Sequence, residues 1–149
     1  MTTIAWDGET LAADCCSWSG GARRKVRKVF KVKSPGGRQF LVAFAGNGDY
    51  AMQILAWMRG ERQRPEPLAF LEQSDLPNQC ALVIDEKRRV WQLANTLTYT
   101  RMREKFYAYG GGQDFAWGAL EAGATARQAI NIAIKRSDMA GLGIDTVKF

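Results

Sequence analysis

Thr2 is the first residue in this chain whose type and position could do chemistry. It follows Met1 directly, and the chain contains no histidine. Threonine is small enough for the initiator methionine normally to be removed, which leaves a hydroxyl and a free α-amine on one residue. An unperturbed α-amine has a pKa of about 7.7–8 and can therefore act as the base that histidine supplies elsewhere. Thr2 is a candidate N-terminal nucleophile, and the lack of histidine excludes Ser–His–Asp and Cys–His hydrolases.

Lys28 is the second candidate. Residues 25–33 alternate in character, which predicts a strand. One face would carry Lys25, Arg27, Lys31 and Lys33, and the other Val26, Lys28, Phe30 and Val32. Lys28 would lie on the apolar face, where an ammonium without a partner is costly. Asp14, at the end of an earlier predicted strand, is the expected partner and would lie near Thr2. A register shifted by one residue would instead expose Lys28.

The bulk properties are those of an ordinary soluble globular protein. With 149 residues the chain is expected to form one domain, 1–149, that buries about 68–70% of its unfolded surface. It has neither an apolar run of membrane-spanning length nor the pattern of a signal peptide, so we expect a cytoplasmic protein. The three cysteines are not spaced for a disulfide framework or a metal site. No metal and no cofactor are expected.

The net charge of +6 is concentrated in one stretch of the chain. Its cations are Arg23, Arg24, Lys25, Arg27, Lys28, Lys31, Lys33 and Arg38. Such a cluster is typical either of a nucleic-acid or acidic-partner surface or of a solvated strand face. Aromatic residues are not interleaved with these charges as a single-strand platform requires. We therefore favour the solvated face and keep a nucleic-acid-binding module as an alternative.

The elements that would position these residues alternate between strands and helices. Strands are predicted at 2–6, 9–15, 25–33, 39–45, 81–84, 90–93, 105–109 and 144–149. Residues 46–49 open a helix that runs to about 59 with Ile54, Leu55 and Met58 inward, and two more helices are predicted at 114–121 and 125–137. Residues 60–78 carry at most a short helix around 68–71. This order indicates helices packed on the outer faces of stacked antiparallel sheets.

Six short segments occur in an order that points to a known family. They are Thr2-Thr3-Ile4, Leu11-Ala12-Ala13-Asp14, Lys28-Val29-Phe30, Phe44-Ala45-Gly46, Gly110-Gly111-Gly112, and Asp138 with residues 141–145. With them the chain resembles the proteasome β-subunit family, particularly the HslV-type peptidase and the small proteasome-like proteins of bacteria and phages. The resemblance spans essentially the full length. It implies an N-terminal nucleophile hydrolase with a four-layer αββα sandwich.

The resemblance also implies a role for each matching residue. Thr2 would be the nucleophile and Lys28 the cation that eases loss of its hydroxyl proton, with Asp14 orienting the lysine. Gly46 would donate its backbone N–H to the tetrahedral oxyanion, and such a donor is worth about 2.7–4 kcal/mol. Asp138 would be a distal acid that supports the threonine.

Two positions depart from the family pattern. Gly111 replaces a serine that lies near the threonine amine, and Gly141 replaces a second serine after the distal acid. Gly111 is still expected to lie beside the nucleophile. Ser17 and Trp18 either line a groove for an extended peptide or form only a turn.

The function expected from these residues is that of a threonine-type endopeptidase. It would work as a homo-oligomeric, self-compartmentalising ring that cleaves peptides or unfolded proteins. Because the chain has no nucleotide-binding motif, any ATP-dependent unfoldase that acts as a partner would have to be a separate chain. A membrane is not an expected partner, and nucleic-acid binding stays the less favoured alternative named above. The alternative is a catalytically weak or silent ring-forming interaction protein, which Gly111 and Gly141 favour.

Overall fold

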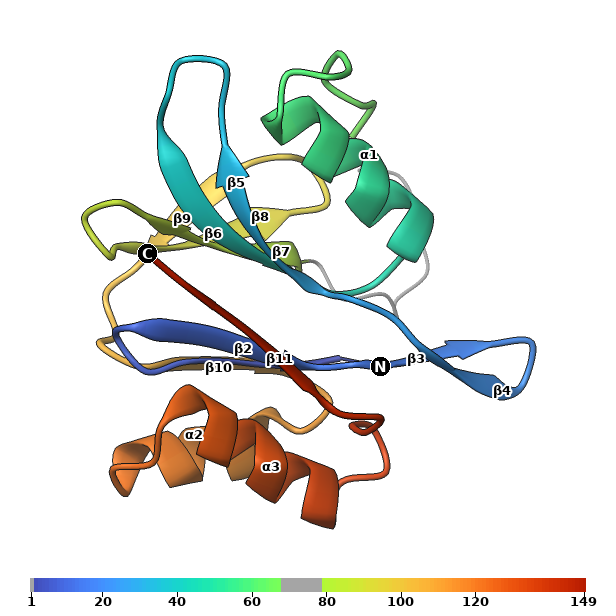
Figure 1. Ribbon diagram of the computed structural model, residues 1–149, viewed down its shortest axis with the longest axis vertical. Helices are drawn as coiled ribbons and strands as arrows, with labels where there is room; N and C mark the ends of the chain where they lie inside the picture. Colours follow the sequence, from blue (N-terminus) through green and yellow to red (C-terminus); the bar gives the residue numbers. More distant parts are fainter. Residues whose placement is uncertain (1, 68–78) are drawn as a thin grey trace.

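The computed structural model in Figure 1 describes residues 2–67 and 79–149, the side chains of residues 79 and 80 excepted. Its strands are β1 (Thr3–Trp6), β2 (Thr10–Asp14), β3 (Cys16–Ser19), β4 (Ala22–Lys25), β5 (Val29–Lys33), β6 (Gln39–Phe44), β7 (Gln79–Asp85), β8 (Val90–Ala94), β9 (Tyr99–Met102), β10 (Tyr107–Gly110) and β11 (Ile144–Lys148). Its helices are α1 (Gly48–Met58), α2 (Gln113–Glu121) and α3 (Ala126–Arg136). The short helix expected around 68–71 lies outside the described residues.

The strands form three antiparallel sheets. One has the order β10-β1-β2-β11, one the order β5-β6-β7-β8-β9, and β3 and β4 pair only with each other. In the first sheet, Thr3 lies opposite Gly110 and Ile4 lies opposite Ala13. The start of β1 is therefore held between the glycine turn after β10 and the end of β2. This register brings the N-terminal segment to Asp14.

Alternation along β1 explains the two layers of core around it. Ile4 and Trp6 point toward the five-stranded sheet and pack with residues such as Leu41 and Leu82. Ala5 lies on the opposite face, in a cluster with small residues of α2 and α3. In Figure 1 these two helices lie along the outer face of the four-stranded sheet. Alanines on both sides of this contact let the helices approach the sheet closely.

The outer face of the five-stranded sheet is packed against α1. This helix begins after Asn47, whose side chain accepts a hydrogen bond from the Tyr50 amide (2.9 Å). Ile54, Leu55 and Met58 are buried on the sheet, as predicted. None of the described helices has the length and apolar character needed to span a membrane.

The predicted four-layer αββα sandwich is wrong. The described residues are mostly β-structure, in three antiparallel sheets with three short helices. Within the described part of the chain, α1 alone packs on the five-stranded sheet. An α-helix is about 10 Å across whereas five strands span about 19 Å, so one helix does not make a layer over that sheet. The β3–β4 hairpin also extends beyond the two stacked sheets as a sheet of its own (Figure 1).

The strand predicted at 25–33 is corrected in a way that bears on the site. β4 ends at Lys25 and β5 begins at Val29, so residues 26–28 link two different sheets. Val26 is 39% exposed instead of buried. The alternation continued through a link, which sequence periodicity cannot distinguish from a strand.

The hairpin predicted at 81–84 and 90–93 is confirmed as β7 and β8. Strand β9 was missed because most of its residues are exposed and leave no apolar pattern.

The start of α3 gives a first testable prediction. Thr125 is its N-cap and forms a capping box in which its side chain accepts from the Gln128 amide (3.2 Å). Replacing Thr125 with alanine should lower the free energy of unfolding by about 1 kcal/mol, because one amide loses its acceptor. Urea denaturation measures this loss. Thr125→Ser retains the oxygen and should stay close to the wild type, so equal losses in both variants would contradict the capping interpretation.

Candidate active site

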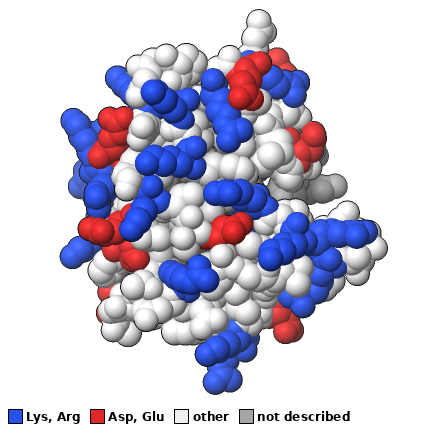
Figure 2. Space-filling model, viewed as in Figure 1, with Lys and Arg blue, Asp and Glu red and all other residues white. Residues whose placement is uncertain are grey.

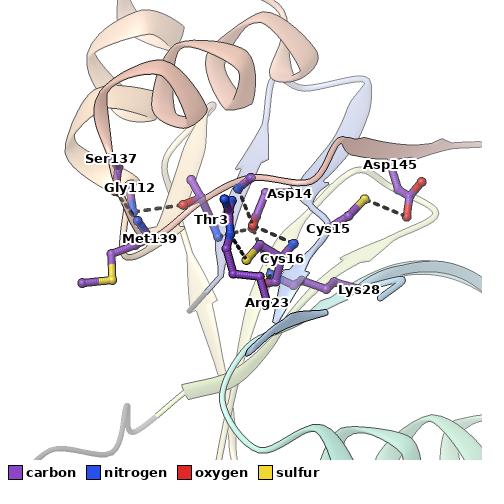
Figure 3. Close-up of polar contacts among 11 residues, drawn as sticks. Thr3, Asp14, Cys15, Cys16, Arg23, Lys28, Gly112, Ser137, Met139 and Asp145 are labelled. Carbon is purple, nitrogen blue, oxygen red and sulfur yellow. Dashed lines mark hydrogen bonds and ion pairs between the residues drawn. The ribbon is translucent and has the colours of Figure 1, made fainter. Parts of the chain in front are cut away.

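Asp14 is the centre of the polar cluster, and its carboxylate is fully buried. Oδ1 accepts from the Thr3 amide (2.8 Å) and from Lys28 Nζ (3.0 Å). Oδ2 accepts from the amides of Cys16 (3.0 Å) and Gly141 (3.1 Å). Four donors from separate parts of the chain therefore meet on one buried carboxylate, and Figure 3 shows Thr3, Cys16 and Lys28 around it. These hydrogen bonds and the ion pair offset the free-energy cost of burying the charged carboxylate.

Lys28 is buried, with a relative exposure of 7%, and it forms an ion pair with Asp14. The predicted partner is therefore confirmed, although Lys28 lies in the link before β5 and not within a strand. Its ammonium also donates to the carbonyl of Cys16, and its own carbonyl accepts from the Phe44 amide (2.9 Å). The ammonium thus reaches the same oxygen that holds the Thr3 amide, beside the Thr2–Thr3 peptide.

The glycine turn after β10 holds the N-terminal segment from the other side. The Gly111 amide donates to the Thr2 carbonyl (2.8 Å), and the Gly112 amide donates to Thr3 Oγ1 (3.0 Å). A Cβ on Gly110 would lie 1.7 Å from the Thr2 carbonyl oxygen. The turn therefore serves close packing. It fixes the half-buried Thr2 between Gly111 and the Asp14–Lys28 pair.

Asp138 lies apart from this pair. It is exposed, and no hydrogen bond among the described residues joins it to Thr2. It lines an open groove of about 620 Å³ together with Trp18 and Gly141. Since the Gly141 amide donates to Asp14, the groove and the buried pair share a wall. The structure thus brings the Thr2–Thr3 segment, Asp14 and Lys28 together, while Asp138 and Trp18 meet in the neighbouring groove.

Ser17 and Trp18 lie on β3, so they belong to a paired strand instead of a simple turn. Ser17 is half-buried, whereas Trp18 is 49% exposed. Gly46 follows β6 with a positive φ of 87°, a backbone conformation that favours glycine. It lies two residues beyond Phe44, whose amide binds the Lys28 carbonyl. The predicted role of Gly46 in binding an oxyanion stays a prediction.

Two residues of the cluster were missed from sequence. Arg23 lines the groove and donates from Nε to Cys16 Sγ (3.5 Å). It was read only as part of a basic run. The signal that could have singled it out is the Gly20-Gly21 turn, which sets Arg23 opposite Trp18. Thr3 is the second residue that was missed. It is fully buried and is hydrogen-bonded through both its amide and its hydroxyl.

The adjacent cysteine Cys15 is not a competing nucleophile. Burial raises the pKa of its thiol to about 11, and its hydrogen bond to Asp145 Oδ2 (3.4 Å) shifts the pKa in the same direction. The thiol therefore stays protonated near neutral pH, and the thiolate is the reactive form. No group of three metal-ligating side chains occurs within residues 2–67 and 79–149. The site therefore brings a buried ammonium, its carboxylate and backbone N–H donors together around the Thr2–Thr3 segment.

Comparison with known proteins gives a fold-level answer. No protein-family model matches the sequence, and no curated protein matches it either. BPH from Thiobacillus denitrificans is similar, with 22% identity and a TM-score of 0.68 over 99% of this chain and 96% of that one. Anbu from Hyphomicrobium sp. strain MC1 has 14% identity and a TM-score of 0.70 over 100% and 82%. Anbu from Pseudomonas aeruginosa, solved as a helical assembly, has 14% identity and a TM-score of 0.69 over 100% and 81%.

These matches correct the resemblance drawn from sequence. BPH and Anbu, the latter described as an ancestral beta-subunit, are proteasome-like proteins that differ from the HslV-type peptidase and the proteasome β-subunit. The assignment to the HslV type is therefore wrong. At identities between 13% and 22% the likeness establishes a shared fold and leaves the chemistry to the residues themselves.

Proposed function

We propose that this protein is a threonine-type peptidase, built as a single domain over residues 1–149, whose nucleophile is Thr2 once Met1 has been removed. The observation that carries the proposal is the buried Lys28–Asp14 ion pair, whose carboxylate oxygen Oδ1 also holds the amide of Thr3. An ion pair in this position is expensive to bury and does not by itself argue for stability. A role of this ion pair in activating the adjacent Thr2 explains why the pair is buried at this position.

The proposed reaction uses only groups of this chain and water. The Thr2 hydroxyl attacks the scissile carbonyl and gives its proton to the free α-amine of the same residue. The tetrahedral intermediate collapses to an ester on Thr2, and the proton leaves with the departing amine. Water then hydrolyses the ester and restores the hydroxyl. The Lys28 ammonium stabilises the negative charge that develops on the hydroxyl oxygen, and Asp14 fixes that ammonium in place.

The remaining residues have supporting roles in this proposal. Gly46 would donate its N–H to the oxyanion, and Gly111 would fix the Thr2 carbonyl through the hydrogen bond already described. Trp18 would bound the substrate groove, and Ser17, which pairs with Arg24 on the other face of the hairpin, would contribute its backbone to that edge. Asp138 would support the Thr2 amine through water, because no direct hydrogen bond joins the two among the described residues.

The proposal includes a homo-oligomer that acts on peptides or unfolded proteins and receives larger substrates from a separate ATP-dependent unfoldase. Two observations support self-association. A protein of the same fold, Anbu of Pseudomonas aeruginosa, forms a helical assembly. Large apolar side chains are also exposed, among them Phe115 (45%) and Met139 (40%). Mass photometry at nanomolar concentration should detect a species of several subunits, and a monomer at micromolar concentration would contradict this part.

A second candidate function rests on a different observation. Gly111 and Gly141 offer no side chain to move protons at the Thr2 amine, and Asp138 is exposed. These features favour a catalytically weak or silent protein that keeps the fold for assembly. The two candidates differ in whether Thr2 reacts.

Covalent labelling tests the peptidase proposal. BPH from Thiobacillus denitrificans has been solved in complex with epoxomicin, so epoxomicin and a peptide vinyl sulfone are suitable probes. We expect each probe to add once to Thr2, as seen by intact mass and peptide mapping. Thr2→Ala should lose labelling completely because the hydroxyl is gone, whereas Thr2→Ser keeps the hydroxyl and should still react.

Intact mass also provides the control for this experiment. Loss of one methionine mass shows that the Thr2 amine is free, which the mechanism requires. A protein that lacks Met1, is folded and still reacts with neither probe would exclude the peptidase and leave the silent assembly protein.

A further inference from the structure

The groove beside the buried pair contains an arginine that the proposed mechanism does not use. Arg23 lines the groove with Trp18, Asp138, Gly141 and Leu142. It lies on β4 directly opposite Trp18 on β3. Its Nε is occupied by Cys16 Sγ, and no carboxylate within residues 2–67 and 79–149 forms an ion pair with it. The remaining N–H groups of the guanidinium are left for a ligand in the groove.

Gly141 explains why the guanidinium lies in this place. A Cβ on Gly141 would lie 2.0 Å from Arg23 Nη2, so any side chain at this position would occupy the space of the guanidinium. In Figure 3 the Arg23 side chain extends beside Cys16, close to Asp14. Because the Gly141 amide is bonded to Asp14 Oδ2, the arginine sits on the wall between the groove and the catalytic candidates. The missing side chain at Gly141 therefore leaves the space in which the guanidinium lies, and the bond to Cys16 Sγ holds it there.

The charges around the groove favour an anionic ligand. Arg24, Lys25 and Arg27 follow Arg23 on β4 and the link after it, and Figure 2 shows blue side chains gathered over the β3–β4 hairpin. Asp14 is neutralised by Lys28. Asp138 is the acidic residue that lines the groove itself, and the cations of the hairpin outnumber it. The local field is therefore positive.

We propose that Arg23 is a specificity-determining residue that binds an acidic side chain of the peptide substrate. The Asp or Glu carboxylate would accept from the free guanidinium N–H groups, while its methylene groups lie against the exposed ring of Trp18. This proposal rests on the peptidase function proposed above and names its substrate class. Arg23 recognises the peptide and takes no part in bond making or breaking.

The test compares matched fluorogenic peptides that differ only by Glu or Gln at one position, with the position varied across a small set. Wild type should have a kcat/KM for the best Glu peptide about 5- to 10-fold above that for its Gln match, as a partly exposed charge-assisted pair allows. Arg23→Gln should remove the difference by lowering kcat/KM for the Glu peptide to about that of its Gln match. Arg24→Gln is the matched control, because adjacent strand residues face opposite sides. The preference should also weaken in high salt.

A second variant tests the positioning step without removing the charge. Gly141→Ala has no backbone strain to overcome, but its Cβ displaces the guanidinium. The ratio of Glu to Gln cleavage should fall as it does in Arg23→Gln. Equal ratios in wild type, Arg23→Gln and Gly141→Ala would overturn the proposal, and so would an equal effect of Arg23→Gln and Arg24→Gln.

Binding to the Thr2→Ala protein separates this proposal from the peptidase function. Fluorescence polarisation of labelled Glu and Gln peptides needs no turnover. Tighter binding of the Glu peptide that depends on Arg23 supports the acidic subsite even if wild type cleaves nothing. Cleavage without any preference for the Glu peptide keeps the peptidase and overturns the subsite.

Discussion

Replacing Asp14 with alanine is expected to lower the free energy of unfolding by about 3–5 kcal/mol, the usual cost of leaving one member of a buried ion pair alone. The Asp14 carboxylate is fully buried and accepts four hydrogen bonds. Alanine would leave the Lys28 ammonium without its carboxylate and three amides without acceptors. Urea denaturation followed by circular dichroism measures the loss.

Two comparisons show whether the loss comes from the buried pair. Glu9→Gln removes one member of an exposed ion pair, Arg88–Glu9 at 3.3 Å, and should change stability by less than about 1 kcal/mol. The double variant Asp14→Ala with Lys28→Met removes the Lys28 ammonium as well. It should be less destabilised than the sum of the two single variants, because the residues are coupled. Strict additivity would contradict the ion-pair account.

The pairing of Lys28 with Asp14 could be predicted from sequence because it follows from a general cost. A cation among apolar residues needs a carboxylate, and Asp14 was the nearby carboxylate at the end of a strand. The prediction succeeded although the strand around Lys28 was misjudged. Periodicity describes a repeating backbone, and residues 26–28 leave one sheet and enter another. The requirement for a partner does not depend on that backbone.

The contacts that could not be predicted join residues far apart in the chain. The Gly141 amide reaches Asp14 across 127 positions, and the Gly112 amide reaches Thr3 across 109. Backbone donors have no signature in the side-chain sequence. The position of Arg23 over Gly141 depends in addition on an empty space, which becomes visible only when the two segments meet. The predicted layer architecture was wrong for a related reason. How much of a sheet its helices cover depends on tertiary packing, which the sequence pattern does not show.

Gly110 is the residue whose replacement should disturb the site most directly. It lies opposite Thr3 in the sheet with a φ of +104°, and an added Cβ would meet the Thr2 carbonyl oxygen at 1.7 Å. Gly110→Ala therefore combines backbone strain with a collision against main-chain atoms that cannot rotate away. We expect a loss of about 3 kcal/mol or more in the free energy of unfolding. Hydrogen exchange at the Gly111 amide should also accelerate, because its bond to the Thr2 carbonyl must lengthen.

Gly123→Ala separates collision from strain. Gly123 has a similar φ of +97°, but a Cβ there meets no atom within 4 Å. This control should lose only about 1–2 kcal/mol from backbone strain and keep both slow exchange at Gly111 and reaction with epoxomicin at Thr2. Gly110→Ala should lose the reaction, since the displaced carbonyl carries Thr2 away from the Lys28–Asp14 pair. If both alanine variants exchange, unfold and react alike, the glycine turn does not hold the N-terminal residue in place.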